Sequence, residues 1–274
     1  MDYPTLDAHA HVAFKGSLED LKSSGAVLAM TLSLEEAGVA AGGRRDWIIW
    51  GAGCHPRFPP AQRAFDIGRF RELIEETAIV GEIGLDTGSR VPLEVQMRNF
   101  RQILKVVART PRLTSIHSYR ATELVLQELR RTPIDVPILH WWTGSAEETS
   151  EAVKLGCYFS VHSQVARQSK FRTRVPQERI LVESDHGYND PPAAIPCRIQ
   201  WVEFLVAQQL KLTVEEVRRL VWRNMAAITS QAQTMDLFPE PFAALLSAAK
   251  AEATVLPTQA ALPGLKESPS RMGG

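Results

Sequence analysis

Histidine and carboxylate side chains stand within or at the ends of short apolar runs spread along this chain, and together they have the chemistry of a metal site. An apolar run that forms a buried strand places such a group where it needs a partner, since burial without one costs about 2–7 kcal/mol. One shared metal site would provide that partner for all of them. The six candidate ligands are His9, His11, Glu82, His117, His140 and Asp185.

Each candidate also has an ordinary interpretation when taken alone. His9 and His11 could be loop or interior histidines that bond to backbone, and Glu82 could pair with a buried arginine. His117 and His140 could be satisfied core histidines, whereas Asp185 could cap a turn. One shared site accounts for the recurrence better than six unrelated roles.

The donor set predicts the reaction class. Imidazole-rich sites with carboxylates favour Zn²⁺, Mn²⁺, Fe²⁺ or Ni²⁺ over Ca²⁺. Six ligands exceed the three of a typical catalytic zinc site, so we expect two divalent ions (Zn, Mn or Mg) about 3.5–4 Å apart, with Glu82 as the bridge. Such a pair lowers the pKa of a water ligand from 15.7 toward about 7. The predicted reaction is therefore hydrolysis, with Glu82 and Asp185 as catalytic residues.

The elements that must position these groups alternate between apolar runs and amphipathic segments. His9 and His11 are two residues apart and so share one face of a strand. Strict alternation predicts parallel pairing through helical crossovers, and eight repeats favour an α/β (β/α)8 TIM barrel with the metal site at the C-terminal strand ends. An open doubly wound sheet fits the alternation but would spread the ligands along a line. The expected strands cover residues 5–8, 26–32, 47–53, 79–83, 112–116, 136–139, 157–161 and 180–183.

The amphipathic segments are expected helices. Three lie between strands, at residues 67–77, 93–108 and 121–131, and two follow the last strand, at 195–210 and 213–227. Thr213 and Glu216 form a capping box at the start of the last one. We expect a barrel domain over residues 1–234 and an Ala/Pro-rich tail over 235–274, with a short helix at 242–251 and a disordered end.

Composition sets limits on the partners and the compartment. The 274 residues are 45% hydrophobic and 23% charged with a formal net charge of zero, so no overall positive field favours nucleic acid. Three cysteines without paired spacing favour a reducing compartment. No apolar stretch approaches the roughly 18 residues of a membrane span, and the first motif leaves no room for a removable leader. We therefore expect a cytoplasmic protein with no membrane partner.

In order, the motifs resemble the signature of the TatD-type metal-dependent deoxyribonucleases from about residue 5 to residue 230. The resemblance rests on His9-Ala-His11, Gly53-Cys54-His55-Pro56, Gly81-Glu82-Ile83-Gly84-Leu85-Asp86, Ile116-His117-Ser118, His140 with Gly144-Ser145, Glu183-Ser184-Asp185 with Tyr188, and Asn224. It implies a barrel in which His9, His11 and Asp185 hold one ion, His117 and His140 hold the second, and Glu82 bridges both. It also implies that Asp185 orients or deprotonates the attacking water, and that DNA is the substrate, often as single strands trimmed from the 3′ end.

The chain departs from the family pattern around the expected pocket. Tyr119 stands where the family usually carries arginine, and Arg120 follows it; Thr87 replaces a common aromatic residue. Trp141 and Trp142 replace a small residue and a phenylalanine, and exposed tryptophans stack on unpaired bases, although packing on the helix at 146–154 is the alternative for one of them. The expected substrate-binding residues are His55, Arg120, Trp141 and Tyr188, and a basic connection that could follow phosphates contains Arg167, Lys170, Arg172 and Arg174.

These departures, with Thr87-Gly88-Ser89, are also similar to the subgroup encoded beside a QueC-like protein and an ATPase in bacterial antiphage systems. That similarity implies protein partners of a defence system. Two other functions remain open: an amidohydrolase that cleaves C–N or ester bonds, whose bridge is commonly a modified lysine rather than Glu82, and a non-catalytic metal-binding subunit of an assembly. The sequence leaves the oligomeric state and the DNA or RNA preference open.

Overall fold

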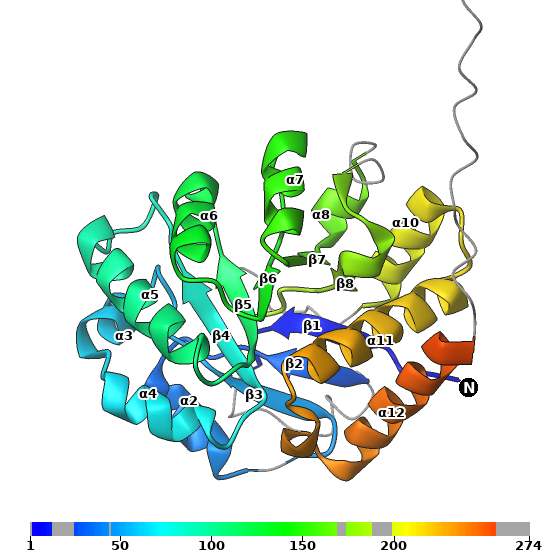
Figure 1. The fold of residues 1–274 in the computed structure, drawn as a ribbon, viewed down its shortest axis with the longest axis horizontal. Helices are drawn as coiled ribbons and strands as arrows, with labels where there is room; N and C mark the ends of the chain where they lie inside the picture. The colour runs from blue at the N-terminus through cyan, green and yellow to red at the C-terminus, as the bar shows by residue number, and fades with distance from the viewer. Residues whose placement is uncertain (1, 13–24, 44, 169–173, 188–198, 256–274) are drawn as a thin grey trace, which may run out of the picture.

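Eight parallel strands form one sheet in the order of the chain, and helices surround it (Figure 1). The computed structural model describes residues 2–12, 25–43, 45–168, 174–187 and 199–255. The strands are β1 (Leu6–Ala10), β2 (Ala26–Ala29), β3 (Ile48–Ala52), β4 (Ile79–Gly84), β5 (Leu113–His117), β6 (Val136–Leu139), β7 (Tyr158–Val161) and β8 (Ile180–Val182). All eight strands expected from the sequence are present, with shifts of up to three residues at their ends.

The sheet curves into a nearly closed TIM barrel, which confirms the predicted fold class. Each strand from β1 to β8 pairs in parallel with the next one. The first and last strands meet just beyond the end of β8, where Asp185 N–H donates to His9 O at 3.0 Å and His11 N–H donates to His186 O at 2.6 Å. These two bonds lie at the C-terminal ends of the strands, beside the candidate metal ligands.

Burial on both faces explains why these strands read as apolar runs. Every residue of β1, β4 and β5 is buried, because the barrel interior covers one face and the helices cover the other. In such a setting the charged and imidazole side chains of these three strands, Asp7, His9, Glu82 and His117, lie in an apolar wall. They therefore depend on one another for hydrogen bonds.

Amphipathic helices form the outer layer, and several begin at capping side chains. Ser33, Asp66, Ser145 and Thr213 each accept a hydrogen bond from a backbone N–H of the first turn. The capping box predicted at Thr213 and Glu216 is confirmed. The helices are α2 (Leu34–Ala41), α3 (Pro59–Ala64), α4 (Ile67–Ile74), α5 (Leu93–Val107), α6 (Thr122–Arg131), α7 (Ala146–Lys154), α8 (Ser163–Ala166), α10 (Gln200–Leu210), α11 (Val214–Gln231) and α12 (Glu240–Val255), with 3-10 turns η1 (Gln177–Arg179) and η2 (Met235–Leu237).

The helix α12 packs along α11 near the N-terminus (Figure 1) and is longer than the helix expected at 242–251. Its residues Phe242, Leu246 and Ala249 are completely buried, and the Phe242 ring lies 5.2 Å from that of Trp222 in α11. Residues 195–198 and 256–274 lie outside the described residues, as does the end that we expected to be disordered. None of the described helices combines the length and the apolar character needed to cross a membrane.

We expect Phe242→Ala to destabilise the protein by about 3–5 kcal/mol, because the change empties a fully buried ring site between α11 and α12. The free energy of unfolding measured in urea checks this value. Phe204→Ala is the matched control, since Phe204 is 40% exposed. Equal and small losses for the two variants would mean that α12 does not contribute to the folded core.

Candidate metal centre

Glu82 lies at the centre of the group of side chains that the sequence predicted. Its Oε1 is 2.6 Å from His117 Nδ1 and 3.1 Å from His140 Nε2. Its Oε2 is 3.0 Å from His11 Nε2 and 3.4 Å from His9 Nε2. One oxygen therefore faces each pair of histidines, which is the arrangement that a bridging carboxylate requires.

Asp185 completes the side of the group that contains His9 and His11. Its Oδ1 lies 3.6 Å from His9 Nε2 and 3.8 Å from His11 Nε2. The backbone of Asp185 has a φ of 50°, in the left-handed region that few residues other than glycine, asparagine and aspartate adopt. This conformation belongs to the turn that follows β8.

The six residues reach one place because each lies in or shortly after one of five strands, at the same end of the barrel. His9 belongs to β1, Glu82 to β4 and His117 to β5, while His140 directly follows β6. The Glu82 backbone is held by the segments that follow β2 and β3, because its N–H donates to Thr31 O at 3.2 Å and its carbonyl accepts from Cys54 N–H at 2.9 Å.

Gly53 permits this close packing at the ends of β2, β3 and β4. A Cβ atom at Gly53 would lie 1.8 Å from Thr31 O and 2.9 Å from Glu82 N. Any side chain there would separate the strand ends. The glycine of the Gly53-Cys54-His55-Pro56 motif thus leaves the space that lets the Glu82 backbone approach Thr31.

Burial and mutual charge fix the protonation of these groups. Burial alone would raise the pKa of Glu82, but His55, His140 and His117 outweigh it and hold that pKa well below its usual value. Burial opposes the protonation of His140, but Glu82 and Glu183 raise its pKa well above the ordinary value, and Glu82 and Asp86 raise that of His117 in the same way. Positive charge beside Glu82 is therefore favoured.

Burial is the largest influence on the pKa values of His9 and Asp185. Burial and the charge of His140 lower the pKa of His9 to about 4, so its ring is neutral at physiological pH and can donate a lone pair. Burial raises the pKa of Asp185 to about 9; the charge of His140 lowers this pKa, and the carboxylates of Glu82, Glu183 and Asp7 raise it. A cation among these groups would favour the ionised form of Asp185.

The donor atoms fit a bound cation. Among the described residues, the buried atoms His9 Nε2 and His11 Nδ1 have no hydrogen-bond partner, and His9 Nε2 faces the carboxylates of Glu82 and Asp185. Spacings of about 3–4 Å between donor atoms match ligands held about 2.0–2.2 Å from one ion. Within the described residues, four groups of this kind contain predicted ligands: His9, His11 and Asp185; Glu82, His117 and His140; His11, His55 and Glu82; and His9, His140 and Glu183. The histidine and carboxylate clusters are able to bind metal.

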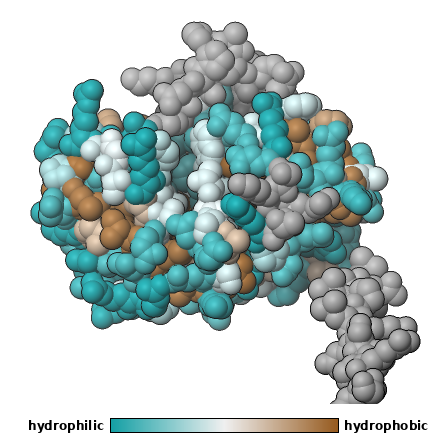
Figure 2. All heavy atoms as spheres, turned by 90° about the horizontal axis from the view of Figure 1, so that it is seen from above, coloured by the Kyte–Doolittle hydropathy of each residue, from teal (hydrophilic) through white to brown (hydrophobic). Residues whose placement is uncertain are grey.

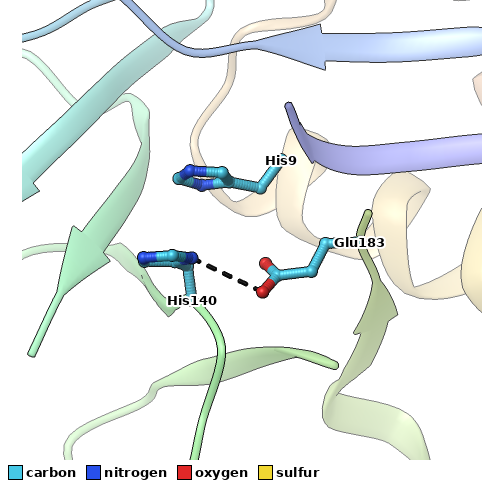
Figure 3. A group of neighbouring side chains, drawn as sticks. All are labelled: His9, His140 and Glu183. Carbon is cyan, nitrogen blue, oxygen red and sulfur yellow. Dashed lines mark ion pairs between the residues drawn. The ribbon is translucent and has the colours of Figure 1, made fainter. Parts of the chain in front are cut away.

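A surrounding layer of residues, none of them among the predicted site residues, orients the histidine rings. Ser115 Oγ lies 2.8 Å from His9 Nδ1, and Asp86 Oδ2 lies 3.1 Å from His117 Nε2. Glu183 Oε1 lies 3.4 Å from His140 Nδ1 (Figure 3). Such outer contacts fix the orientation of a metal-binding histidine ring and the nitrogen atom that faces the metal.

Glu183 is buried and holds several parts of this layer together. Figure 3 shows its carboxylate pointing toward the stacked rings of His9 and His140, whose centroids are 4.0 Å apart. It also accepts hydrogen bonds from Trp141 N–H, at 2.7 Å, and from the Ser160 hydroxyl. Asp86 and Glu183 lie in the motifs that we singled out, and their position two to four residues from a ligand was the available signal.

Asp7 links β1 to the turn that carries Asp185. Its Oδ1 accepts from Ser184 N–H at 3.0 Å, and its Oδ2 accepts from the Ser184 hydroxyl. Burial raises the pKa of Asp7 to about 7, although the bonds from Ser184 and His9 N–H lower it. This carboxylate therefore positions both the first and the last ligand segments.

His55 lies closer to the metal candidates than its predicted role in substrate binding required. Its Nε2 is 3.2 Å from Glu82 Oε2, and the residue is buried. Burial lowers its pKa, against the charge of Glu82. Its contact with substrate stays a prediction.

A cavity of about 320 Å³ opens beside Glu82, His117, His140 and Asp185. Among the predicted substrate-binding residues, His55 and Trp141 line it, together with the Tyr119 side chain. Arg120 is exposed, and its guanidinium lies 5.3 Å from the centroid of the Tyr119 ring. Tyr188 lies outside the described residues, as do Lys170 and Arg172.

The two adjacent tryptophans have different environments. Trp142 is buried, and its Nε1–H donates to Thr149 of α7 at 2.9 Å, as the packing alternative predicted. Trp141 lines the cavity with its ring 3.9 Å from that of His162. Its φ of 43° turns the chain between the two rings.

With this geometry in place, the sequence matches the family described as TatD related DNase over residues 6–230. The chain belongs to this family. It is 26% identical over 194 residues to the uncharacterized metal-dependent hydrolase YabD of Bacillus subtilis, covering 65% of this chain and 76% of that protein. It is 28% identical over 167 residues to a mouse protein named "Putative deoxyribonuclease TATDN3", covering 57% of each chain.

The fold is shared with a solved TatD homologue, YjjV of Escherichia coli K12. The TM-score is 0.71 at 19% identity, covering 81% of this chain and 96% of that one. Family membership and the clustered donors identify the chain as a metal-dependent hydrolase of the TatD family.

We expect the affinity for Zn²⁺ or Mn²⁺ to rise with pH from about 5 to 8, because a bound ion displaces the protons that Glu82 stabilises on His117 and His140. Because the pKa values of these two histidines are raised, their rings stay protonated to higher pH than ordinary histidines do, and a metal ion must displace more protons as the pH falls. Calorimetric titrations in two buffers of different ionisation enthalpy measure the released protons. An affinity independent of pH would contradict this protonation pattern.

Glu183→Gln should weaken metal binding by about 10- to 100-fold, the usual effect of losing an outer carboxylate that orients a ligand histidine. The amide keeps the shape but loses the charge beside His140 Nδ1. Competition with a metal-sensitive dye provides the affinity. Glu178→Gln, an exposed change just before β8, is the matched control and should bind as the wild type does.

Proposed function

We propose that this chain hydrolyses phosphodiester bonds of DNA, in single strands or at 3′ ends, with a water molecule activated by two divalent ions. The observation that carries the proposal is the position of Glu82, with Oε1 beside His117 and His140 and Oε2 beside His9 and His11. A donor that divides its two oxygens between two histidine pairs suits two ions better than one.

In this proposal His9, His11 and Asp185 hold one ion, His117 and His140 hold the other, and Glu82 contacts both. The bound ions, Zn²⁺, Mn²⁺ or Mg²⁺, would supply Lewis acidity and would lower the pKa of water toward about 7. The chain supplies the fixed geometry, through Ser115, Asp86 and Glu183 in the layer outside the ligands.

Asp185 is the candidate base of the reaction. Its Oδ1 faces the two histidines of β1 and its side chain lines the cavity, so it can orient a water molecule and accept a proton from it. A carboxylate whose pKa is raised by burial is a stronger base once it is ionised. The Asp7 contacts to Ser184 hold this residue in place.

DNA as the substrate is supported by the family description and by the aromatic lining of the cavity. Trp141 and Tyr119 offer ring faces next to the ligand group, and such faces stack on unpaired bases. The amidohydrolase alternative is less favoured, because the fourth strand offers Glu82 rather than a lysine for the bridge. His55, Arg120 and Tyr188 remain proposed contacts of the substrate.

The proposed setting is a reducing cytoplasm, since Cys54 and Cys157 are buried free thiols. Participation in antiphage defence, with protein partners, rests on the sequence similarity around Thr87, Gly88 and Ser89 alone. Thr87 donates a hydrogen bond to Arg120 O, and Gly88 N–H donates to Asp86, whose other carboxylate oxygen contacts His117.

The test incubates the purified protein with labelled single-stranded and duplex DNA and with RNA, in Mn²⁺, Mg²⁺ or Zn²⁺. We expect cleavage that depends on the metal and falls by about 10²-fold or more in Glu82→Gln, because the bridge contributes several kcal/mol of charge stabilisation. Chelation should abolish cleavage of every substrate.

Glu94→Gln, at an exposed position in α5, is the matched control and should cleave as the wild type does. Circular dichroism shows whether both variants are folded. Absence of cleavage of any nucleic acid by folded, metal-loaded wild type would refute the nuclease proposal. Cleavage of an amide or ester substrate under the same conditions would favour the amidohydrolase alternative.

A further inference from the structure

Two large aromatic side chains are exposed side by side on α10. Trp201 is 47% exposed and Phe204 is 40% exposed, with ring centroids 5.3 Å apart and planes 19° apart. The surface seen in Figure 2 is mainly hydrophilic, with hydrophobic residues in separate patches. Two exposed, stacked aromatic rings contribute little to the folded core, so they point to a binding surface.

A cation lies over the Trp201 ring of this pair. The guanidinium carbon of Arg167, the residue that ends α8, is 5.9 Å from the centroid of the Trp201 ring. This distance allows a cation–π interaction. Residues 167–174 contain four basic and no acidic side chains, so the charge of this part of the chain favours a polyanion.

The helix α8 connects this surface to the cavity beside the ligand group. The ring of its N-cap, His162, lies 3.9 Å from that of Trp141 with the planes tilted by 32°, and Gln164 lines the cavity. Arg167 follows Gln164 by three residues, which is about 4.5 Å along a helix. The helices α8 and α10 are in contact. Aromatic and basic groups thus continue from Trp141 outward to Phe204.

We propose that Arg167, Trp201 and Phe204 form an outer binding track for an unpaired nucleic-acid strand whose end lies in the cavity. Bases stack on the two rings while Arg167 contacts the backbone phosphates, which is how proteins bind single strands without reading their sequence. The proposal rests on the proposed nuclease function for what happens in the cavity, but binding to the track does not require cleavage. A protein partner and a second copy of this chain are the competing occupants.

Binding is measured without cleavage, in chelator, by fluorescence anisotropy with labelled single strands of about 4 and about 16 nucleotides, the range that one single-strand-binding domain covers. The double variant W201A/F204A should bind the long strand roughly 25-fold more weakly, since each lost stacking contact costs about 5-fold or more. The loss for the short strand should be much smaller, because a strand whose end lies in the cavity then has few nucleotides left to reach Trp201 and Phe204.

Trp47→Ala is the matched control, because Trp47 is 36% exposed just before the opposite, N-terminal end of β3. Thermal unfolding shows that each variant is folded. Arg167→Ala keeps both rings and should lower the salt dependence of long-strand affinity by about one phosphate contact. This second variant tests the track even if the double variant does not fold.

Cleavage by the metal-loaded protein separates this proposal from the nuclease proposal. If W201A/F204A lowers the ratio of kcat/KM for the long strand to that for the short strand, both are supported. If the wild type binds the long strand through these residues but cleaves nothing, the nuclease proposal fails and the track stands. Unchanged affinity of W201A/F204A and R167A for the long strand overturns the track. So does a shift of oligomeric state in W201A/F204A without loss of affinity, which assigns the surface to an interface between copies.

Discussion

The buried charge of Glu82 is the constraint on which the rest of the site depends. Its side chain is 1% exposed in the middle of an apolar strand, where an unpaired carboxylate would be strongly disfavoured. Five histidines from other strand ends and loops lie within 3.4 Å of its two oxygens. The same arrangement that stabilises the carboxylate also creates the donor set for cations. The contacts that the fold needs are therefore the same contacts that would bind metal. Removing the imidazoles would leave Glu82 buried without a partner, and removing Glu82 would do the same to the imidazoles.

A second set of contacts converts this clustering into a defined geometry. Asp86 and Glu183 hold the outer nitrogens of His117 and His140, and Asp7 holds the turn of Asp185 through Ser184. Three carboxylates thus act without being assigned as ligands, and each one is buried. The strand ends supply the positions, while these outer carboxylates select the ring orientations. Uncommon backbone conformations at Trp141 and Asp185, with φ of 43° and 50°, occur where the chain must turn directly after a strand.

The strand order and the six central side chains could be predicted from sequence, because buried parallel strands are apolar runs and a polar residue at their ends stands out. The outer layer was harder to predict. Asp86 and Glu183 lie beside the motif residues, but their partners are 31 and 43 residues away and their contacts follow from strand register. The two tryptophans have the same sequence environment, and only the turn after His140 sends Trp142 into the core and Trp141 to the cavity. The extent of α12 depended on its packing against α11, which an Ala/Pro-rich composition conceals.

The junction between β1 and β8 has a mechanical consequence. The two hydrogen bonds that join these strands, from Asp185 N–H and His11 N–H, belong to the same segments that present His9, His11 and Asp185. An ion bound by these three side chains would therefore link β1 to β8, the two strands between which the barrel closes. The hydrogen-exchange rates of the Asp185 and His11 amides would then report whether an ion is bound, because separating the two segments breaks these hydrogen bonds and also moves the three ligands apart.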